Sequence, residues 1–163
     1  MTFIVRLVAV LVSLLLMVPS PGRAADGPSF TLDGLVLHRR QITLAALQAM
    51  PAVTVEASYS GGHSGDPAKY KGVLLWDLLQ QVELADVENK NGKLRRALLI
   101  TGRDGYSAAL AEGEIDPDYA GKTVILAYEK DGMKLEGGDV LLVVPGDKRG
   151  GRYVHDVVHI EVK

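Results

Sequence analysis

The sequence predicts an α+β domain with a mixed or mainly antiparallel sheet and a few short helices. Three observations support this fold class. Short apolar or β-branched runs recur along most of the chain, as strands require. Two or three segments show the apolar spacing of a helix. The expected elements do not alternate in the β-α-β order that is typical of a parallel sheet, so a mixed or antiparallel arrangement is favoured.

The first 24 residues have the features of a secretory signal peptide. Arg6 precedes an apolar run over residues 7–18, and Gly22-Arg23-Ala24 supplies the small residues of a cleavage site. The run is too short to span a membrane comfortably, although an uncleaved anchor is the alternative. We therefore expect cleavage, a periplasmic location and no membrane insertion of the mature protein. A single domain then covers residues 25–163, which is long enough to bury a core.

The domain is expected to begin with a hairpin and a short helix. Strands over residues 29–32 and 35–37 flank Asp33-Gly34, a dipeptide that is typical of tight hairpin turns. Thr43 can cap a helix over residues 44–50, which a proline then ends.

A strand, a long loop and an amphipathic helix are expected next. Residues 53–57 are rich in β-branched side chains, which favours a strand. Residues 58–71 are polar and glycine-rich, and long loops of this kind often carry function. The following residues recur at helical spacing and form one apolar stripe, which consists of Leu74, Leu75, Leu78, Leu79 and Val82.

The C-terminal half is predicted to consist mostly of strands. Turn sequences separate its apolar runs, among them Asn91-Gly92, the GRDG segment at 102–105 and Asp131-Gly132. The expected strands cover residues 97–101, 106–110, 123–129, 140–144 and 153–162.

Composition and partial motifs argue against several classes of function. The formal net charge is −2, and no basic face indicates nucleic-acid binding. The chain has no cysteine, so a metal site would need histidine or carboxylates. HDVVH at 155–159 approaches the zinc motif H-E-x-x-H, but its valines predict a strand, where the two histidines lie about 13 Å apart. AGKT at 120–123 lacks the first glycine of a phosphate-binding loop.

Several side chains are compatible with either a ligand site or an ordinary structural role. His63 is a general base, a ligand donor or a solvated loop residue, and Trp76 is a core aromatic that could also line a pocket. Asp104 is a turn residue by default. The segment PGDKRGGRYVHDV at 145–157 gathers Lys148, Arg149 and Arg152 around two glycines, either as an exposed turn or as a ligand site.

Four segments, taken in order, resemble the sulfite-oxidase-type molybdopterin-binding fold: YKGVLLWDLLQQVEL, ALLITGRDGYSAAL, VILAYEKDGMKL and LLVVPGDKRGGRYVHDVVHIEV. The resemblance runs from about residue 31 to residue 163 and is most specific at its V-V-P-G-D-x-x-G-G-x-x-V ending. That family carries a molybdenum-ligating cysteine after the strand at 53–57, where this chain has Ser58, Tyr59 and Ser60. Hydroxyls are poor substitutes for a soft thiolate.

The chain is therefore similar to small exported members of that fold, which bind a pterin without the metal. Some of them resemble partners of membrane proteins that make or degrade cyclic-di-GMP. This resemblance implies a tetrahydropterin-like ligand, no molybdenum and a possible protein partner, the periplasmic domain of a membrane signalling protein.

In this interpretation the glycines allow the backbone to approach the ligand closely, and the arginines donate hydrogen bonds to acceptors on the pterin ring. An aromatic side chain stacks on the ring, and Asp104 or Asp139 accepts hydrogen bonds from its donor edge. The candidate ligand-binding residues are Tyr59, Ser60, Gly61, His63, Trp76, Asp104, Tyr106, Arg149, Gly150, Gly151, Arg152, Tyr153 and His155. No catalytic or metal-ligating residue is assigned.

Three functions remain open. The first is a non-catalytic pterin-binding protein that passes ligand occupancy to its partner. The second is a molybdopterin-dependent oxidoreductase with an unusual metal ligand, or an accessory subunit of one. The third is a protein-interaction module on the same fold. For the first, Arg152 is expected to matter more than Lys148, because a nearly neutral pterin favours paired, directional donors over a point charge.

Overall fold

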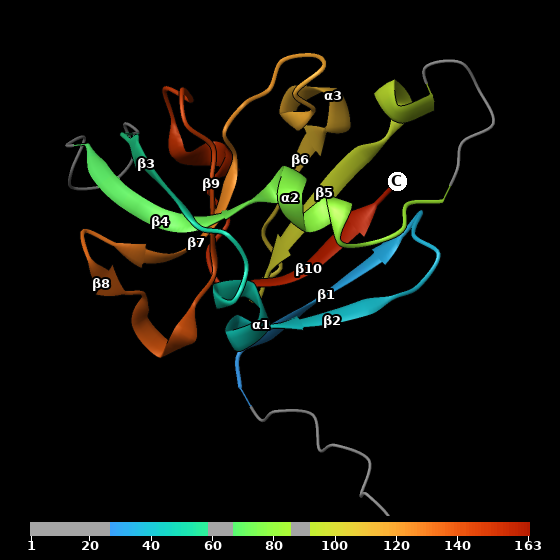
Figure 1. The fold of residues 1–163 in the computed structure, drawn as a ribbon. Coiled ribbons are helices and arrows are strands. Elements are labelled where there is room, and N and C mark those ends of the chain that lie inside the picture. The colour runs from blue at the N-terminus through green and yellow to red at the C-terminus, as the bar shows by residue number, and fades with distance from the viewer. Residues whose placement is uncertain (1–26, 59–66, 86–91) are drawn as a thin grey trace, which may run out of the picture.

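Two sheets of five strands each form the described part of the protein (Figure 1). The computed structural model describes residues 27–58, 67–85 and 92–163. The first sheet has the order β2-β1-β10-β5-β6, and its strands are β1 (Ser29–Gly34), β2 (Arg40–Thr43), β5 (Ala97–Gly102), β6 (Ser107–Ala111) and β10 (Val157–Val162). The second has the order β3-β4-β7-β8, with β9 also paired to β7, and its strands are β3 (Val53–Ala57), β4 (Ala68–Leu74), β7 (Ile125–Lys130), β8 (Met133–Lys134) and β9 (Leu141–Val143).

The pairing of the strands confirms the predicted α+β class. β1 and β10 are parallel, while the other pairs of both sheets are antiparallel. The helices are short, as expected: α1 (Leu44–Gln48), α2 (Leu75–Gln80), α3 (Glu112–Ile115) and the 3₁₀ turns η1 (Gly92–Arg95), η2 (Glu136–Gly138) and η3 (Gly150–Arg152). In the described part of the chain, no helix is long and apolar enough to cross a membrane.

One core joins the two sheets and the helix α2. Alternate residues of β5 and β6 are buried, and Ile125 to Tyr128 of β7 are buried in succession. The predicted stripe of α2 supplies Leu75, Leu78 and Leu79 to this core, with Val82 just beyond the helix. Burial of these apolar side chains is the main favourable contribution to folding.

Two local predictions are confirmed in detail. The Thr43 hydroxyl accepts a hydrogen bond from the Ala46 amide at 3.1 Å, so Thr43 is the N-cap of α1. The helix itself ends at Gln48, two residues before the predicted end. The strand predicted at residues 53–57 is β3.

The hairpin turn predicted at Asp33-Gly34 is wrong. β1 continues through Gly34 because it pairs with β10 up to the Gly34–Val162 position, and residues 35–39 then lead to β2. Gly34 has φ +92°, and a Cβ there would lie 2.0 Å from the Val162 carbonyl oxygen. Glycine is therefore required by close approach to β10 and not by a tight turn.

Other elements also differ from prediction. β4 begins at Ala68, inside the loop predicted at 58–71, because it pairs with both β3 and β7. The strand predicted at 153–162 begins only at Val157, because the chain bends at Asp156, which has φ 45°. α3 was not predicted at all. Residues 1–26, 59–66 and 86–91 lie outside the described residues, so the signal peptide and part of the Asn91-Gly92 turn are not tested by the structure.

Candidate ligand site

The glycine turn η3 is held against the hairpin that joins β5 and β6. The Tyr106 hydroxyl donates a hydrogen bond to the Gly151 carbonyl oxygen at 2.6 Å. Beside Gly151 the space is open, since an added Cβ would meet no described heavy atom within 4 Å. The turn is therefore anchored through its backbone and leaves room for another molecule beside Gly151.

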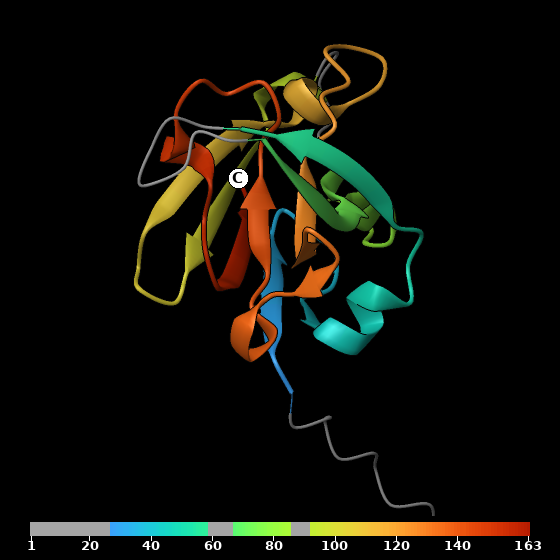
Figure 2. The same ribbon diagram turned by 90° about the vertical axis from the view of Figure 1, so that its left-hand side faces the viewer.

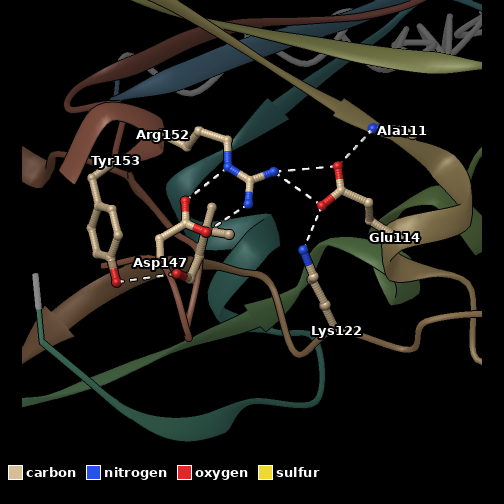
Figure 3. A network of polar contacts seen from close by, with 7 residues as sticks. Ala111, Glu114, Lys122, Asp147, Arg152 and Tyr153 are labelled. Carbon is tan, nitrogen blue, oxygen red and sulfur yellow. Dashed lines mark hydrogen bonds and ion pairs between the residues drawn. The ribbon is translucent and has the colours of Figure 1, made fainter. Parts of the chain in front are cut away.

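Arg152 lies at the centre of an ionic network (Figure 3). Its Nε and Nη2 donate to the two oxygens of Asp147 at 2.8 and 2.6 Å, and its Nη1 donates to Glu114 at 3.0 Å. Lys122 Nζ also donates to Glu114, at 2.6 Å. The guanidinium predicted to clamp a ligand thus binds two carboxylates of its own chain. Its contribution to ligand binding stays a prediction.

The charges of this network hold both carboxylates in the ionised form. Burial raises the pKa of Glu114, but hydrogen bonds from Lys122 and Arg152 outweigh it and lower this pKa to about 2. The hydrogen bonds from Arg152 also lower the pKa of Asp147. In turn, Asp147 raises the pKa of Arg152. Two cations therefore face two carboxylates at neutral pH.

Helix α3, which carries Glu114, is anchored by a second ion pair. Glu112 is 2% exposed, and its Oε2 lies 2.5 Å from Nε of Arg96. Burial raises the pKa of Glu112, while Arg96 opposes that shift. The helix thus links a buried ion pair on one side to the Arg152 network on the other.

The Arg152 network predicts a specific loss of stability in acid. The pKa of Glu114 is about 2 in the folded protein and near 4.5 when unfolded, so its stabilisation is complete above pH 4.5 and disappears as the pH falls towards 2. The side chain is 27% exposed, so we expect a loss of about 2–3 kcal/mol across this window. Urea unfolding from pH 5 to pH 2 measures it.

The Glu114→Gln variant should be less stable at neutral pH and should lose less stability across that window. The matched Glu83→Gln variant, at an exposed loop position, should follow the wild type. Parallel pH profiles for wild type and Glu114→Gln would contradict the assignment.

A second group of polar residues, distinct from the glycine turn, lines a cleft. It has a volume of about 750 Å³ and is lined by Gly27, Pro28, Arg103, Glu136, Gly137, Asp139 and Asp156. Arg103 Nη2 donates to Asp156 Oδ1 at 3.3 Å, and the Arg103 amide donates to the Asp156 carbonyl oxygen at 2.9 Å. The volume is in the range of small-molecule pockets.

Asp139 gives this cleft a largely buried carboxylate. Its side chain is 20% exposed, and its Oδ1 is buried with no hydrogen-bond partner among the described residues. Burial raises the pKa of Asp139, while the backbone N–H groups of Asp156 and Val140 and the nearby His155 oppose this shift. His155 Nδ1 lies 3.7 Å from Asp139 Oδ2. Because Oδ1 is shielded from solvent, a ligand N–H would reach this carboxylate through its other oxygen, Oδ2.

Of the predicted residues, Asp139 lines the cleft and His155 lies beside Asp139. Asp104 Oδ1 accepts from the Tyr106 amide at 2.9 Å, so this carboxylate closes a turn, and Asp139 is the one that lines the cleft. The Tyr106 side chain is 48% exposed, and His155 and Arg149 are exposed as well. Tyr106 is therefore accessible for stacking.

Two of the proposed stacking residues lie elsewhere. Tyr153 is 5% exposed within the core, and its hydroxyl donates to the Val144 carbonyl oxygen at 3.3 Å. Trp76 is half-buried on α2 and packs against the core. The chain between η3 and β10 turns the Tyr153 ring inward, so this ring is not exposed for stacking. Its contribution to ligand binding stays a prediction.

Some candidates are untested, and others were missed. Tyr59, Ser60, Gly61 and His63 lie outside the described residues. Arg103 and Asp156 were not among the predicted site residues. They are 53 positions apart in the sequence, and only the folding of the chain brings them together. The only local signal for Arg103 was its place in the turn sequence GRDG, between two glycines.

The chain offers few ligands for a soft metal ion. It contains no cysteine. Among the described residues, no group of three or more histidines and carboxylates is arranged to hold a metal ion. Of the two histidines in HDVVH, His159 lies in β10, where its Nε2 is 2.7 Å from Asp33 Oδ1, and His155 precedes that strand. The helix that a zinc-protease motif requires is not formed here.

Comparison with known proteins agrees with the fold. Residues 18–163 match the family model of the oxidoreductase molybdopterin binding domain. Among solved structures, the chain is similar to the sulfane dehydrogenase SoxCD from Paracoccus pantotrophus, with a TM-score of 0.66 and 19% sequence identity. The match covers 82% of this chain and 37% of that one, so the chain spans little more than a third of the enzyme's length. No curated protein matches in sequence.

Proposed function

Because the chain belongs to the family of oxidoreductase molybdopterin binding domains, we propose that it is a pterin-binding protein whose ligand occupies the polar cleft around Asp139. Its fold is of the sulfite-oxidase type, and such a domain suggests a pterin-type cofactor. The observation that carries the proposal is the partly exposed carboxylate of Asp139 in the lining of the cleft, which forms no ion pair with a lysine or arginine among the described residues.

The chemistry of a pterin matches the groups around this cleft. Its pyrimidine ring presents adjacent N–H donors, which a carboxylate such as Asp139 accepts. Arg103 and His155 offer N–H groups to the carbonyl and ring-nitrogen acceptors. The exposed Tyr106 ring is not in the lining of the cleft, but it is on the same hairpin as Arg103 and is the aromatic candidate for stacking.

The charge of the cleft favours a ligand without a phosphate. Three carboxylates line it, those of Glu136, Asp139 and Asp156, against the single guanidinium of Arg103. A phosphate dianion would be repelled by this excess of negative charge, whereas a neutral ring would not. This balance supports a simple tetrahydropterin-like ligand over a phosphorylated one.

The residues of this chain do not fit a molybdenum centre of the family's kind. The ligating position after β3 offers Ser58, Tyr59 and Ser60 in place of cysteine, and hydroxyls bind a soft metal poorly. We therefore derive no redox step for this protein. The proposed role is reversible binding, in which occupancy of the cleft is passed to a partner.

The location and the partner belong to the same proposal. The apolar run at 7–18 and the small residues at 22–24 support export to the periplasm. The resemblance to pterin-responsive proteins supports the periplasmic domain of a membrane signalling protein as the partner. N-terminal sequencing of protein recovered from the periplasm tests the export step, and a retained Met1 would contradict it.

Purified protein should contain a pterin and no stoichiometric molybdenum. Full-length protein is expressed in a host that makes both pterins and the molybdenum cofactor. Extracted pterin is measured by its fluorescence after oxidation, and molybdenum is measured by elemental analysis of the same sample. Titration of ligand-free protein with tetrahydropterin then gives the affinity.

Each outcome favours a different function. Near-equimolar molybdenum that persists through gel filtration would favour the oxidoreductase, which the family match makes the second candidate. Protein that neither retains nor binds a pterin would contradict the proposal and favour an interaction module on this fold.

A further inference from the structure

Strand β3 forms an open edge of the second sheet. It pairs with β4 at all five positions, from Val53–Gly72 to Ala57–Ala68, with no shift of register. It has no strand on its other side among the described residues, and no described residue forms a hydrogen bond with its backbone from that side. β3 lies at the outside of the molecule, as Figures 1 and 2 show from two directions.

This edge has few of the features that usually protect exposed strands. Natural sheets protect their edges with charged side chains, especially lysines, and with prolines, bulges or covering segments. Glu56 is the single charged residue of β3. β3 has the sequence VTVEA, which contains no lysine or proline, and its pairing shows no bulge. By contrast, β2 starts with an arginine, and β6 lies against η3 through the Tyr106–Gly151 hydrogen bond. A regular edge with few such features is a template for another extended chain.

The two faces of β3 differ in a way that specifies the side chains of such a chain. Val53 and Val55 are half-buried and pack against the core. The exposed Thr54 and Glu56 point to the other face, where a groove of about 660 Å³ runs across β3, β4 and β7. A strand added beside β3 would extend the apolar layer on one face and border the groove on the other.

The charges in the groove leave one carboxylate at the edge without a partner. Glu56 is opposite Lys69 in the register, and Thr54 is opposite Lys71. Lys71 Nζ lies 3.5 Å from Glu129 on β7. Neither Glu56 nor Lys69 forms an ion pair in the part of the chain that the structure describes. Glu56 is therefore available to a cation on an added strand.

We propose that β3 is the docking site for an extended segment of a partner protein. The segment adds to the sheet as a further strand, with apolar residues at alternate positions beside Val53 and Val55. It carries a lysine or arginine beside Glu56. The site shares no residue with the polar cleft, so it does not depend on pterin binding.

A random peptide library displayed on phage tests the proposal on the full chain. Selected peptides should alternate apolar and polar residues and should contain a lysine or arginine. A synthetic copy of the strongest binder should slow amide hydrogen exchange in β3. Failure to enrich any peptide, or protection of another region in place of β3, would overturn the proposal.

Charge reversal at the edge provides a second measurement. Glu56→Lys should weaken binding of the selected peptide about tenfold, because it places like charges side by side. Glu83→Lys makes the same change at an exposed position after α2 and should leave the affinity unchanged. Thermal melts check that both variants fold. Equal peptide affinities of wild type and Glu56→Lys would contradict the proposal. Protection of β3 that rises with protein concentration in the absence of peptide would also contradict it, because the occupant would then be a second copy of this chain.

Discussion

Replacing Arg152 with alanine should destabilise the folded protein by about 2–4 kcal/mol. The substitution leaves Asp147 and Glu114 without the guanidinium that both accept from, and their side chains are only 19% and 27% exposed. Lys122 still donates a hydrogen bond to Glu114 in the variant. The loss of stability should therefore be smaller than for breaking a fully buried ion pair. Urea unfolding at neutral pH measures the change.

Lys148→Ala is the matched control for the loss of a cation. Lys148 is exposed in the same loop and has no ion pair among the described residues, so its removal should change stability by less than about 0.5 kcal/mol. Arg152→Lys should be intermediate, because an ammonium cannot reproduce the paired hydrogen bonds to Asp147. Equal stability of wild type and Arg152→Ala would refute the structural role.

The same variants test the sequence-based prediction that Arg152 holds the ligand. A lost hydrogen bond to a pterin would weaken binding roughly ten- to hundredfold, equivalent to about 1–3 kcal/mol. The informative protein is Arg152→Lys, if its melt shows that it is folded. Unchanged pterin affinity in this variant and in folded Arg152→Ala would mean that Arg152 acts only on the fold.

Asp139→Ala should weaken pterin binding by about ten- to hundredfold. The substitution removes the acceptor for the ligand's N–H donors and leaves those donors unpaired in the complex. Asp139→Asn should be intermediate, since the amide keeps one acceptor oxygen but loses the charge and adds a competing donor. Titration followed by pterin fluorescence measures both.

Substitution of Asp139 should not lower the stability of the fold, although it weakens ligand binding. Burial raises the pKa of Asp139, so the ionised carboxylate is less stable in the folded protein than in the unfolded chain. Asp139→Asn should therefore be at least as stable as wild type at neutral pH. Such a combination, weaker binding with unimpaired folding, is typical of a residue retained for function.

Asp104→Asn is the matched control for this charge change. Asp104 uses its oxygen in the turn to Tyr106, and asparagine can accept the same hydrogen bond. Its pterin affinity should equal that of wild type. An affinity that falls with Asp104→Asn but not with Asp139→Asn would transfer the ligand-binding carboxylate to the hairpin.

Local patterns predicted most of the strands and one helix start correctly. β3 has the predicted ends, and β5, β6 and β9 lie within one or two residues of prediction, because alternation and turn residues act over a few positions. Thr43 was recognisable as a cap since its bond reaches only three residues along the chain. The errors arose where a distant strand intervened, as when β10 extended β1 past Asp33-Gly34.

The sequence by itself determined the fold class, the missing thiolate and the set of polar groups from which a site could be built. Only the tertiary structure decided how those groups are used. Arg152 meets Glu114 across 38 positions and Arg103 meets Asp156 across 53, distances that strand pairing closes and no local pattern encodes. Burial also distinguishes two similar carboxylates. Asp104 closes a turn in solvent, whereas Asp139 is only 20% exposed and lines the cleft, because water access depends on what packs around a side chain.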